Sequence, residues 1–196
     1  NMYLFGTGHS GGANLADVLP FGMPPNSNAL PAINGTKPII TGPTHGITLA
    51  SGNTIRGVEV GYCPGGSKIF GNGFGTLTIG NTTTPDVNLT GNRQVLNLTN
   101  GSFDASSKIG TISSLDTSTI VLNTVSGTLA VGSTTVNANQ LLKAIDIQNS
   151  SAALDFGATT ASHFGSGTVI NIANSGSGSV TFSTLSIPNA GNGVGL

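Results

Sequence analysis

The sequence predicts an all-β fold, a right-handed parallel β-helix (β-solenoid) with about 25 residues per coil. Two observations predict it. Of nine prolines, none falls between Pro85 and Pro188, so this stretch can be hydrogen-bonded throughout. Within it an apolar, variable, apolar motif that ends in Asn or Thr recurs at steps of 24, 25 and 25 residues, whereas helical periodicity is almost absent. Such a period indicates short strands stacked coil upon coil.

Three apolar patches define each of the last three predicted coils, whereas the coil of Leu98 is irregular because its next apolar pair, Ile109 and Ile112, comes late. The first strands are expected in the segments Leu96–Asn100, Ile120–Thr124, Ile145–Asn149 and Ile170–Asn174. The second patches are Leu129–Val131, Leu154–Phe156 and Val180–Phe182, and the weaker third patches are Thr134–Val136, His163–Phe164 and Leu185–Ile187. One coil cannot fold alone, because ordering the backbone costs roughly 1–2 kcal/mol per residue and each buried apolar side chain returns only about 1.5–3 kcal/mol. We therefore expect stability to belong to the array.

The residue that ends each first strand is predicted to form a structural ladder. Its members are Asn100, Thr124, Asn149 and Asn174. Asn tolerates a left-handed backbone, and stacked amides can bond along the axis of a solenoid. The four positions are therefore expected to lie above one another at a bend.

Before the regular repeats the pattern is looser. Short alternating stretches occur at Ile47–Leu49, Thr54–Val60, Leu77–Asn81 and Val87–Thr90. Residues 39–196 are therefore expected to form the β-helix coils. Residues 1–38 are expected to form an irregular coil or cap with a Pro-rich insertion, in which Ala13–Leu19 places three apolar residues on one helical face.

The charge content excludes some functions. Only 13 of 196 residues are charged, 7% against roughly 25% in soluble domains. Nucleic-acid binding by a basic face is not expected, and neither is direct insertion into a membrane. The single Cys63 allows no internal disulfide. The first residue is Asn1 and not Met, and no basic stretch precedes an apolar run, so we expect that any signal peptide has been removed or lies outside this fragment.

One segment matches a dinucleotide-binding pattern, which is not expected to operate because no acidic residue lies about 20 positions further on and no second strand follows it, and also a hydrolase pattern. Residues Gly6–Gly12 satisfy both G-x-G-x-x-G and G-x-S-x-G. The second pattern would make Ser10 a nucleophile, with Asp116 or Asp146 and His163 as partners. The chain lacks the upstream strands and alternating helices that a hydrolase of this kind needs, so a Gly-rich turn is favoured.

The acidic residues are scattered singly, and only Asp146 and Asp155 share a predicted coil, both facing outward. Paired-carboxylate catalysis needs separations of roughly 5–10 Å. His9, His45 and His163 lack metal-ligand spacing, and Cys63 is expected to be inert. We therefore expect no catalytic residues, no metal site and no cofactor.

Residues His45–Val60, with the Ser/Thr/Asn/Gly-rich and Cys-poor repeats after Gly75, resemble the coil consensus of right-handed β-helices in bacterial surface proteins. The chain as a whole is similar to part of an autotransporter passenger or a large adhesin-like protein, which implies that it is a fragment of a larger exported protein. That resemblance implies an extracellular location at the bacterial outer-membrane surface, and host-cell or neighbouring-cell proteins or glycans as partners.

The leading hypothesis is a non-enzymatic, surface-exposed or secreted adhesin scaffold, with binding determinants on outward side chains and on the loops Pro20–Pro31 and Phe103–Lys108. One alternative is a polysaccharide lyase or hydrolase, including the phage tailspike type, whose acids meet across coils. Another is a structural spacer or an ice-binding solenoid. Ice binding would need a repeated T-x-T face, and Thr76–Thr78 and Thr117–Thr119 do not recur in register.

Overall fold

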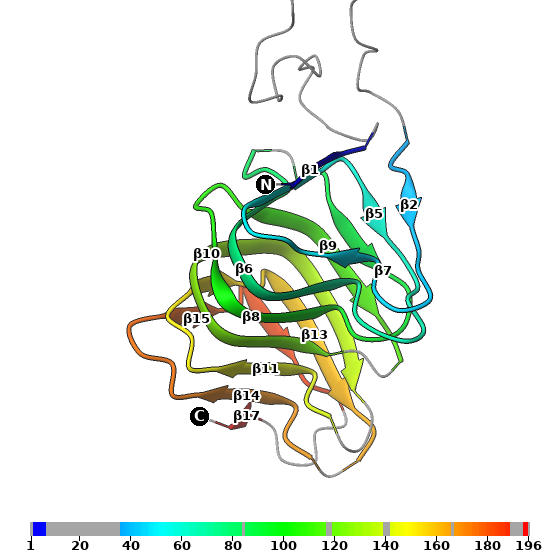
Figure 1. Cartoon of the computed structure of the whole chain (residues 1–196). Coiled ribbons are helices and arrows are strands. Elements are labelled where there is room, and N and C mark those ends of the chain that lie inside the picture. The colour runs from blue at the N-terminus through cyan, green and yellow to red at the C-terminus, as the bar shows by residue number, and fades with distance from the viewer. Residues whose placement is uncertain are drawn as a thin grey trace, which may run out of the picture.

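A computed structural model describes residues 2–6, 36–83, 85–116, 119–138, 142–165, 167–188 and 194–195. These residues contain seventeen strands and no helix, and every strand pairing is parallel (Figure 1). Successive coils lie on one another from β1 at one end of the stack to β17 at the other (Figure 1). The chain is a β-solenoid, which confirms the predicted fold class.

The strands are β1 (Met2–Phe5), β2 (Ile39–Ile40), β3 (Ile47–Thr48), β4 (Asn53–Arg56), β5 (Glu59–Val60), β6 (Ile69–Ile79), β7 (Asn88–Thr90), β8 (Leu96–Phe103), β9 (Lys108–Ser114), β10 (Ile120–Ala138), β11 (Ile145–Gln148), β12 (Ala153–Asp155), β13 (Ala158–His163), β14 (Ile170–Ala173), β15 (Ser179–Thr181), β16 (Thr184–Ser186) and β17 (Val194–Gly195).

The first face of the solenoid follows the predicted repeat. Leu98 pairs with Leu122, Leu122 with Ile147, and Ile147 with Ile172. The column of paired residues at the start of this face is Ile47, Ile69, Leu96, Ile120, Ile145, Ile170 and Val194, at steps of 22, 27, 24, 25, 25 and 24 residues. Coils near the start of the chain therefore vary in length more than the later ones.

The second and third faces complete each coil. Leu154 pairs with Leu129 on one side and Val180 on the other, as the patches predicted. The third face departs from prediction in one coil, because Thr159, and not the segment His163–Phe164, lies between Thr134 and Leu185. Thr159 occupies this inward position because its hydroxyl donates to the Phe156 carbonyl at 3.0 Å, so no polar atom is left unpaired there.

The first residues of the chain belong to the stack. Strand β1 pairs in parallel with β4, Met2 opposite Asn53 and Phe5 opposite Arg56. Most of the predicted cap and Pro-rich insertion, residues 7–35 with the segment Ala13–Leu19, lies outside the described residues.

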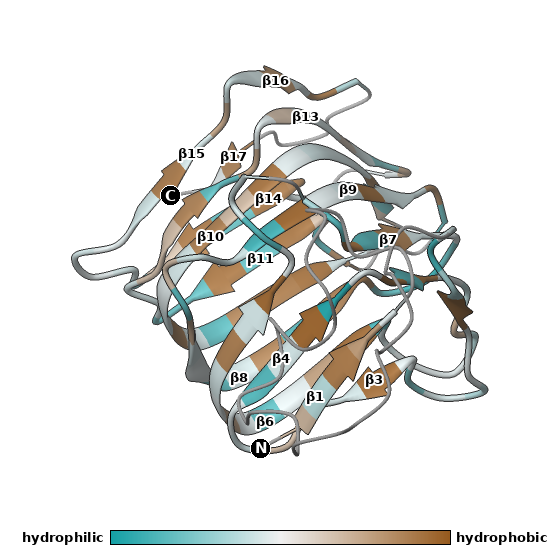
Figure 2. Cartoon of the chain, turned by 90° about the horizontal axis from the view of Figure 1, so that it is seen from above, coloured by the Kyte–Doolittle hydropathy of each residue, from teal (hydrophilic) through white to brown (hydrophobic). Residues whose placement is uncertain are grey.

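The interior is apolar and continuous along the stack. Inward residues such as Leu98, Ile120 and Ile147 are almost fully buried, and apolar and polar residues alternate along the strands (Figure 2). A buried ion pair joins Arg56 Nη2 to Asp86 Oδ2 at 2.8 Å. Among the described residues, no helix has the length and hydropathy needed to cross a membrane.

Candidate ligand-binding groove

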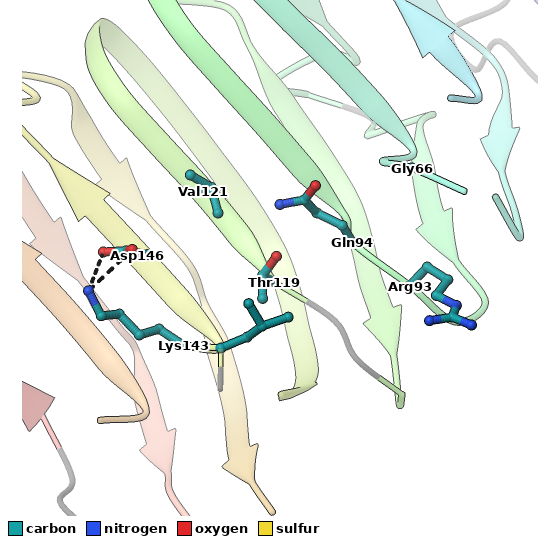
Figure 3. A pocket seen from close by; sticks show the side chains of 8 residues that line it. Gly66, Arg93, Gln94, Thr119, Val121, Lys143 and Asp146 are labelled. Carbon is teal, nitrogen blue, oxygen red and sulfur yellow. Dashed lines mark hydrogen bonds and ion pairs between the residues drawn. The ribbon is translucent and has the colours of Figure 1, made fainter. Parts of the chain in front are cut away.

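A surface groove of about 470 Å³ lies at one corner of the solenoid (Figure 3). It is lined by Gly66, Arg93, Gln94, Thr119, Val121, Leu142, Lys143 and Asp146. These residues lie just before or at the start of β6, β8, β10 and β11, so they come from four successive coils. At about 4.8 Å between coils, the groove extends roughly 14 Å along the stack.

Asp146 points outward because its neighbours Ile145 and Ile147 face the core. Its carboxylate accepts hydrogen bonds from Asn171 Nδ2 at 2.7 Å and Gln148 Nε2 at 3.0 Å, and Lys143 Nζ lies 3.3 Å away. Asp146 is the one acid among the described residues that line the groove, and hydrogen-bond donors surround its carboxylate. The paired carboxylates of acid–base glycoside hydrolysis are not assembled here.

Arg93 stands at the other end of the groove in a left-handed backbone conformation, with φ of 79°. Its N–H donates to the Asp116 carbonyl at 2.9 Å. Its own carbonyl accepts from Ser114 Oγ at 2.9 Å and from Lys68 Nζ at 3.1 Å. These bonds hold a conformation that a non-glycine residue seldom adopts.

Lys68 anchors this loop from inside the protein. The side chain is fully buried, and Nζ also donates to the Asn92 carbonyl at 3.0 Å. Burial lowers the pKa of Lys68 to about 8, and the nearby Cys63 opposes that shift. The lysine therefore holds the loop that carries Arg93 at some cost in desolvation.

Gln94 connects the groove to an aromatic pair. Its Oε1 accepts from Ser67 Oγ at 2.7 Å, and the Ser67 backbone N–H donates to His45 Nδ1 at 3.0 Å. The His45 ring stacks on Phe70 with centroids 4.5 Å apart. The ring lies against Gly66, where a Cβ would come within 2.5 Å of His45 Nδ1, so the glycine makes room for the imidazole.

In the Ser–His–Asp arrangement considered from the sequence, His163 does not meet either of its candidate acids, Asp116 and Asp146. His163 is buried in β13, and neither of its ring nitrogens has a hydrogen-bond partner in the described structure. Asp146 is bonded to other side chains on another face, and Asp116 is exposed in the loop after β9. Ser10 lies outside the described residues, as does His9.

The remaining candidates are separate from the groove. Asp155 is exposed in β12 and accepts from the Gly157 N–H at 3.0 Å, so it lies on a different face from Asp146. Cys63 is buried. Within the described ranges no three His, Cys, Asp or Glu side chains gather as a metal site would require.

The predicted ladder positions share one backbone conformation. Asn100, Thr124, Asn149 and Asn174 have φ of 55°, 56°, 50° and 51°. Two amide bonds between coils start from this corner: Asn149 Nδ2 donates to Asn123 Oδ1 at 3.1 Å, and Asn100 Nδ2 donates to Asn72 Oδ1 at 3.5 Å. Each acceptor lies one residue before the ladder position in the preceding coil.

No family model, curated protein or solved structure matches this chain. Any proposal about its function therefore depends on the chain's own residues.

Sequence reasoning did not single out Arg93, Gln94 and Lys143. The sequence nevertheless indicates their position. All three lie two or three residues before the first residue of a predicted first strand, which is Leu96 or Ile145. In a stacked repeat, such equivalent positions meet at one corner.

Proposed function

We propose that this protein is a non-enzymatic, surface-exposed or secreted adhesin-type scaffold that binds a host-cell or neighbouring-cell glycan in the groove. The observation that carries the proposal is the lining itself. The described lining combines one fully hydrogen-bonded carboxylate with amide, hydroxyl and cationic groups, and none of its other residues is acidic. Such a surface suits recognition of many hydroxyl groups without a reaction. The location would be extracellular or at the bacterial outer-membrane surface.

The first face adds further support. Its outward row holds Phe70, Asn97, Val121, Asp146 and Asn171 in register, so amides and an aromatic ring lie beside the groove. Amides donate and accept, as sugar hydroxyls do, and an aromatic face offers apolar contact. The parallel strands hold these groups at fixed spacing, which reduces the entropy lost on binding.

The test compares binding with turnover. The purified chain is applied to a glycan array and incubated with polysaccharides, and released products are analysed by mass spectrometry. We expect retention of a defined glycan class and no new product. Product formation that disappears in Asp146→Asn or Asp116→Asn, but not in Asp155→Asn as the matched control, would establish an enzyme and refute the proposal.

A second candidate function, binding of ice, rests on the third face. Thr90, Ser113, Thr135, Thr160 and Ser186 form an unbroken column of paired residues over five strands, all half-buried or exposed. Beside it, Thr111, Ser133 and Thr184 belong to a second column, which is interrupted by Ala158. Hydroxyl pairs thus do recur in register, at positions other than the T-x-T segments of the sequence analysis. Hydroxyls at about 4.8 Å spacing can hold water in a regular row.

Ice binding is measured as inhibition of ice recrystallisation by the purified chain. If the columns bind ice, Thr135→Tyr, in the middle of the face, abolishes the inhibition, and Val121→Tyr on the groove face preserves it. Wild-type protein without inhibition eliminates this candidate.

A further inference from the structure

We infer that the groove takes a linear, carboxylated saccharide, with the Arg93 guanidinium and the Lys143 ammonium as its two cationic contacts. The inference rests on the proposed function and specifies the ligand class of the same site.

The first step is the charge of the groove. The residues described in its lining include two cations and one carboxylate. The Asp146 carboxylate already accepts from Asn171 and Gln148, and Lys143 is 3.3 Å away with its side chain 36% exposed. Lys143 therefore retains donors for a ligand. The groove carries an excess positive charge although the whole chain has a net charge of −1.

Arg93 supplies the second contact. The guanidinium makes no ion pair within the described parts of the chain, and its Nε is buried without a hydrogen-bond partner. Its backbone is nevertheless held in the left-handed region by bonds from Ser114 and Lys68. A planar guanidinium that makes no ion pair with the described residues and extends from a fixed backbone is suited to a carboxylate.

The spacing of the cations sets the shape of the ligand. Arg93 precedes β8 and Lys143 precedes β11, which are two coil steps apart, or about 10 Å along the stack. They lie toward opposite ends of the groove, with Gln94 and Thr119 between them (Figure 3). A linear ligand lying along the axis would therefore reach both cations with acidic groups on separate units.

The groups between the cations favour a saccharide over an acidic peptide. Gln94 accepts through Oε1 from Ser67, which leaves its amide N–H₂ for a ligand hydroxyl. Val121 and Leu142 give apolar contact suited to a sugar-ring face. The amides of Asn97 and Asn171 continue this polar surface on neighbouring strands.

The experiment uses an oligomer of galacturonic acid and its fully methyl-esterified form, which share a backbone and differ in charge. Isothermal titration calorimetry on the whole chain is expected to show binding of the acid and at least tenfold weaker binding of the ester. Arg93→Gln and Lys143→Gln should each weaken binding of the acid about 10- to 100-fold, since a hydrogen bond to a charged group contributes about 1.5–3 kcal/mol. Lys143→Arg should preserve binding. Lys108→Gln, in β9 away from the groove, is the matched control.

The outcomes separate the two proposals. Equal binding of acid and ester overturns the inference and leaves a glycan-binding scaffold standing. If neither oligomer binds but the protein binds a neutral glycan on the array, the inference is also overturned and the glycan-binding scaffold stands. If the protein binds nothing on the array either, both the inference and the proposed function are refuted. Loss of binding in Lys108→Gln to the same extent as in Arg93→Gln shows diffuse charge attraction and overturns the inference. Tighter binding of an oligoglutamate peptide also overturns it.

Discussion

At the scale of single residues, the corner after each first strand requires a left-handed backbone. Asn100, Thr124, Asn149 and Asn174 have φ values between 50° and 56°. An L-residue in this region costs roughly 1–2 kcal/mol, least for Asn, whose short side chain finds local hydrogen bonds. The recurrence of Asn at this position therefore has a conformational cause as well as an amide contact between coils.

Asn149 tests the conformational cause. Asn149→Val should lower the free energy of unfolding by about 2–3 kcal/mol, because a β-branched residue is strained at positive φ and the 3.1 Å bond to Asn123 is lost. Asn149→Gly loses the same bond without the strain and should cost about half as much. Urea denaturation measures both. Equal losses would show that the amide contact, and not the backbone, selects Asn here.

Lys68 is the second residue with an unusual environment, a buried ammonium that serves the loop of Arg93. Its pKa in the folded protein is about 8, below the ordinary 10.5. The unfolded chain therefore binds this proton more tightly than the folded chain does. The penalty is complete below pH 8 and is relieved as the pH rises toward 10.5.

The lowered pKa of Lys68 predicts how the stability of the protein changes with pH. Relative to Lys68→Met, the wild-type protein should gain stability between about pH 8 and pH 10.5, and the difference between the two should be constant below pH 8. Urea midpoints at several pH values measure the difference. A wild-type advantage that shrinks as pH rises would contradict the desolvation of Lys68.

At the scale of elements, glycine shapes bends within long strands and the spacing between coils. Gly73 and Gly127 both have positive φ, 68° and 84°, in β6 and β10. A Cβ on Gly127 would lie 1.9 Å from the Phe103 carbonyl oxygen of the neighbouring coil, whereas a Cβ on Gly73 would meet nothing within 4 Å. The two positions separate backbone conformation from the close approach of coils.

Alanine at these two glycines provides the comparison. Gly73→Ala should cost at most about 1–2 kcal/mol, the penalty of a left-handed alanine. Gly127→Ala should cost clearly more, because the backbone of the adjacent coil must also move. Thermal unfolding followed by circular dichroism ranks the two. Similar losses would mean that the stack yields easily between β8 and β10.

At the scale of the whole molecule, stability comes from coils that cover each other. Leu122 lies in a column between Leu98 and Ile147 and is fully buried. Leu185, in β16 near the last coil, is 40% exposed. Among the described strands it has a paired residue on one side only, Thr159 of β13. A residue covered by coils above and below loses more on truncation than one near the end of the array.

These two leucines measure the difference. Leu122→Ala should cost about 2–5 kcal/mol through the cavity it leaves inside the stack, and Leu185→Ala less than about 1.5 kcal/mol. Chemical denaturation of the intact chain gives both values. Equal costs would show that the terminal coil is as tightly packed as the middle of the solenoid.

The sequence alone determined the repeat. The inward residues Leu98, Leu122, Ile147 and Ile172 and the Asn or Thr at the following corner are local in the chain, because alternation and period follow from strand geometry and coil length. The same logic failed where a coil used a polar inward residue. The sequence pointed to His163–Phe164 as the third patch of that coil, whereas Thr159 takes the inward position and its hydroxyl donates to the Phe156 carbonyl.

Only the tertiary structure decided the groove. Arg93, Gln94, Lys143 and Asp146 are up to 53 residues apart and meet because stacked coils align the starts of their strands. The backbone conformation of Arg93 depends on a buried lysine 25 residues earlier, and the separation of Asp146 from His163 depends on which face each strand occupies. A period states how far apart equivalent residues are in the chain, but contact between side chains depends on how the loops between them turn.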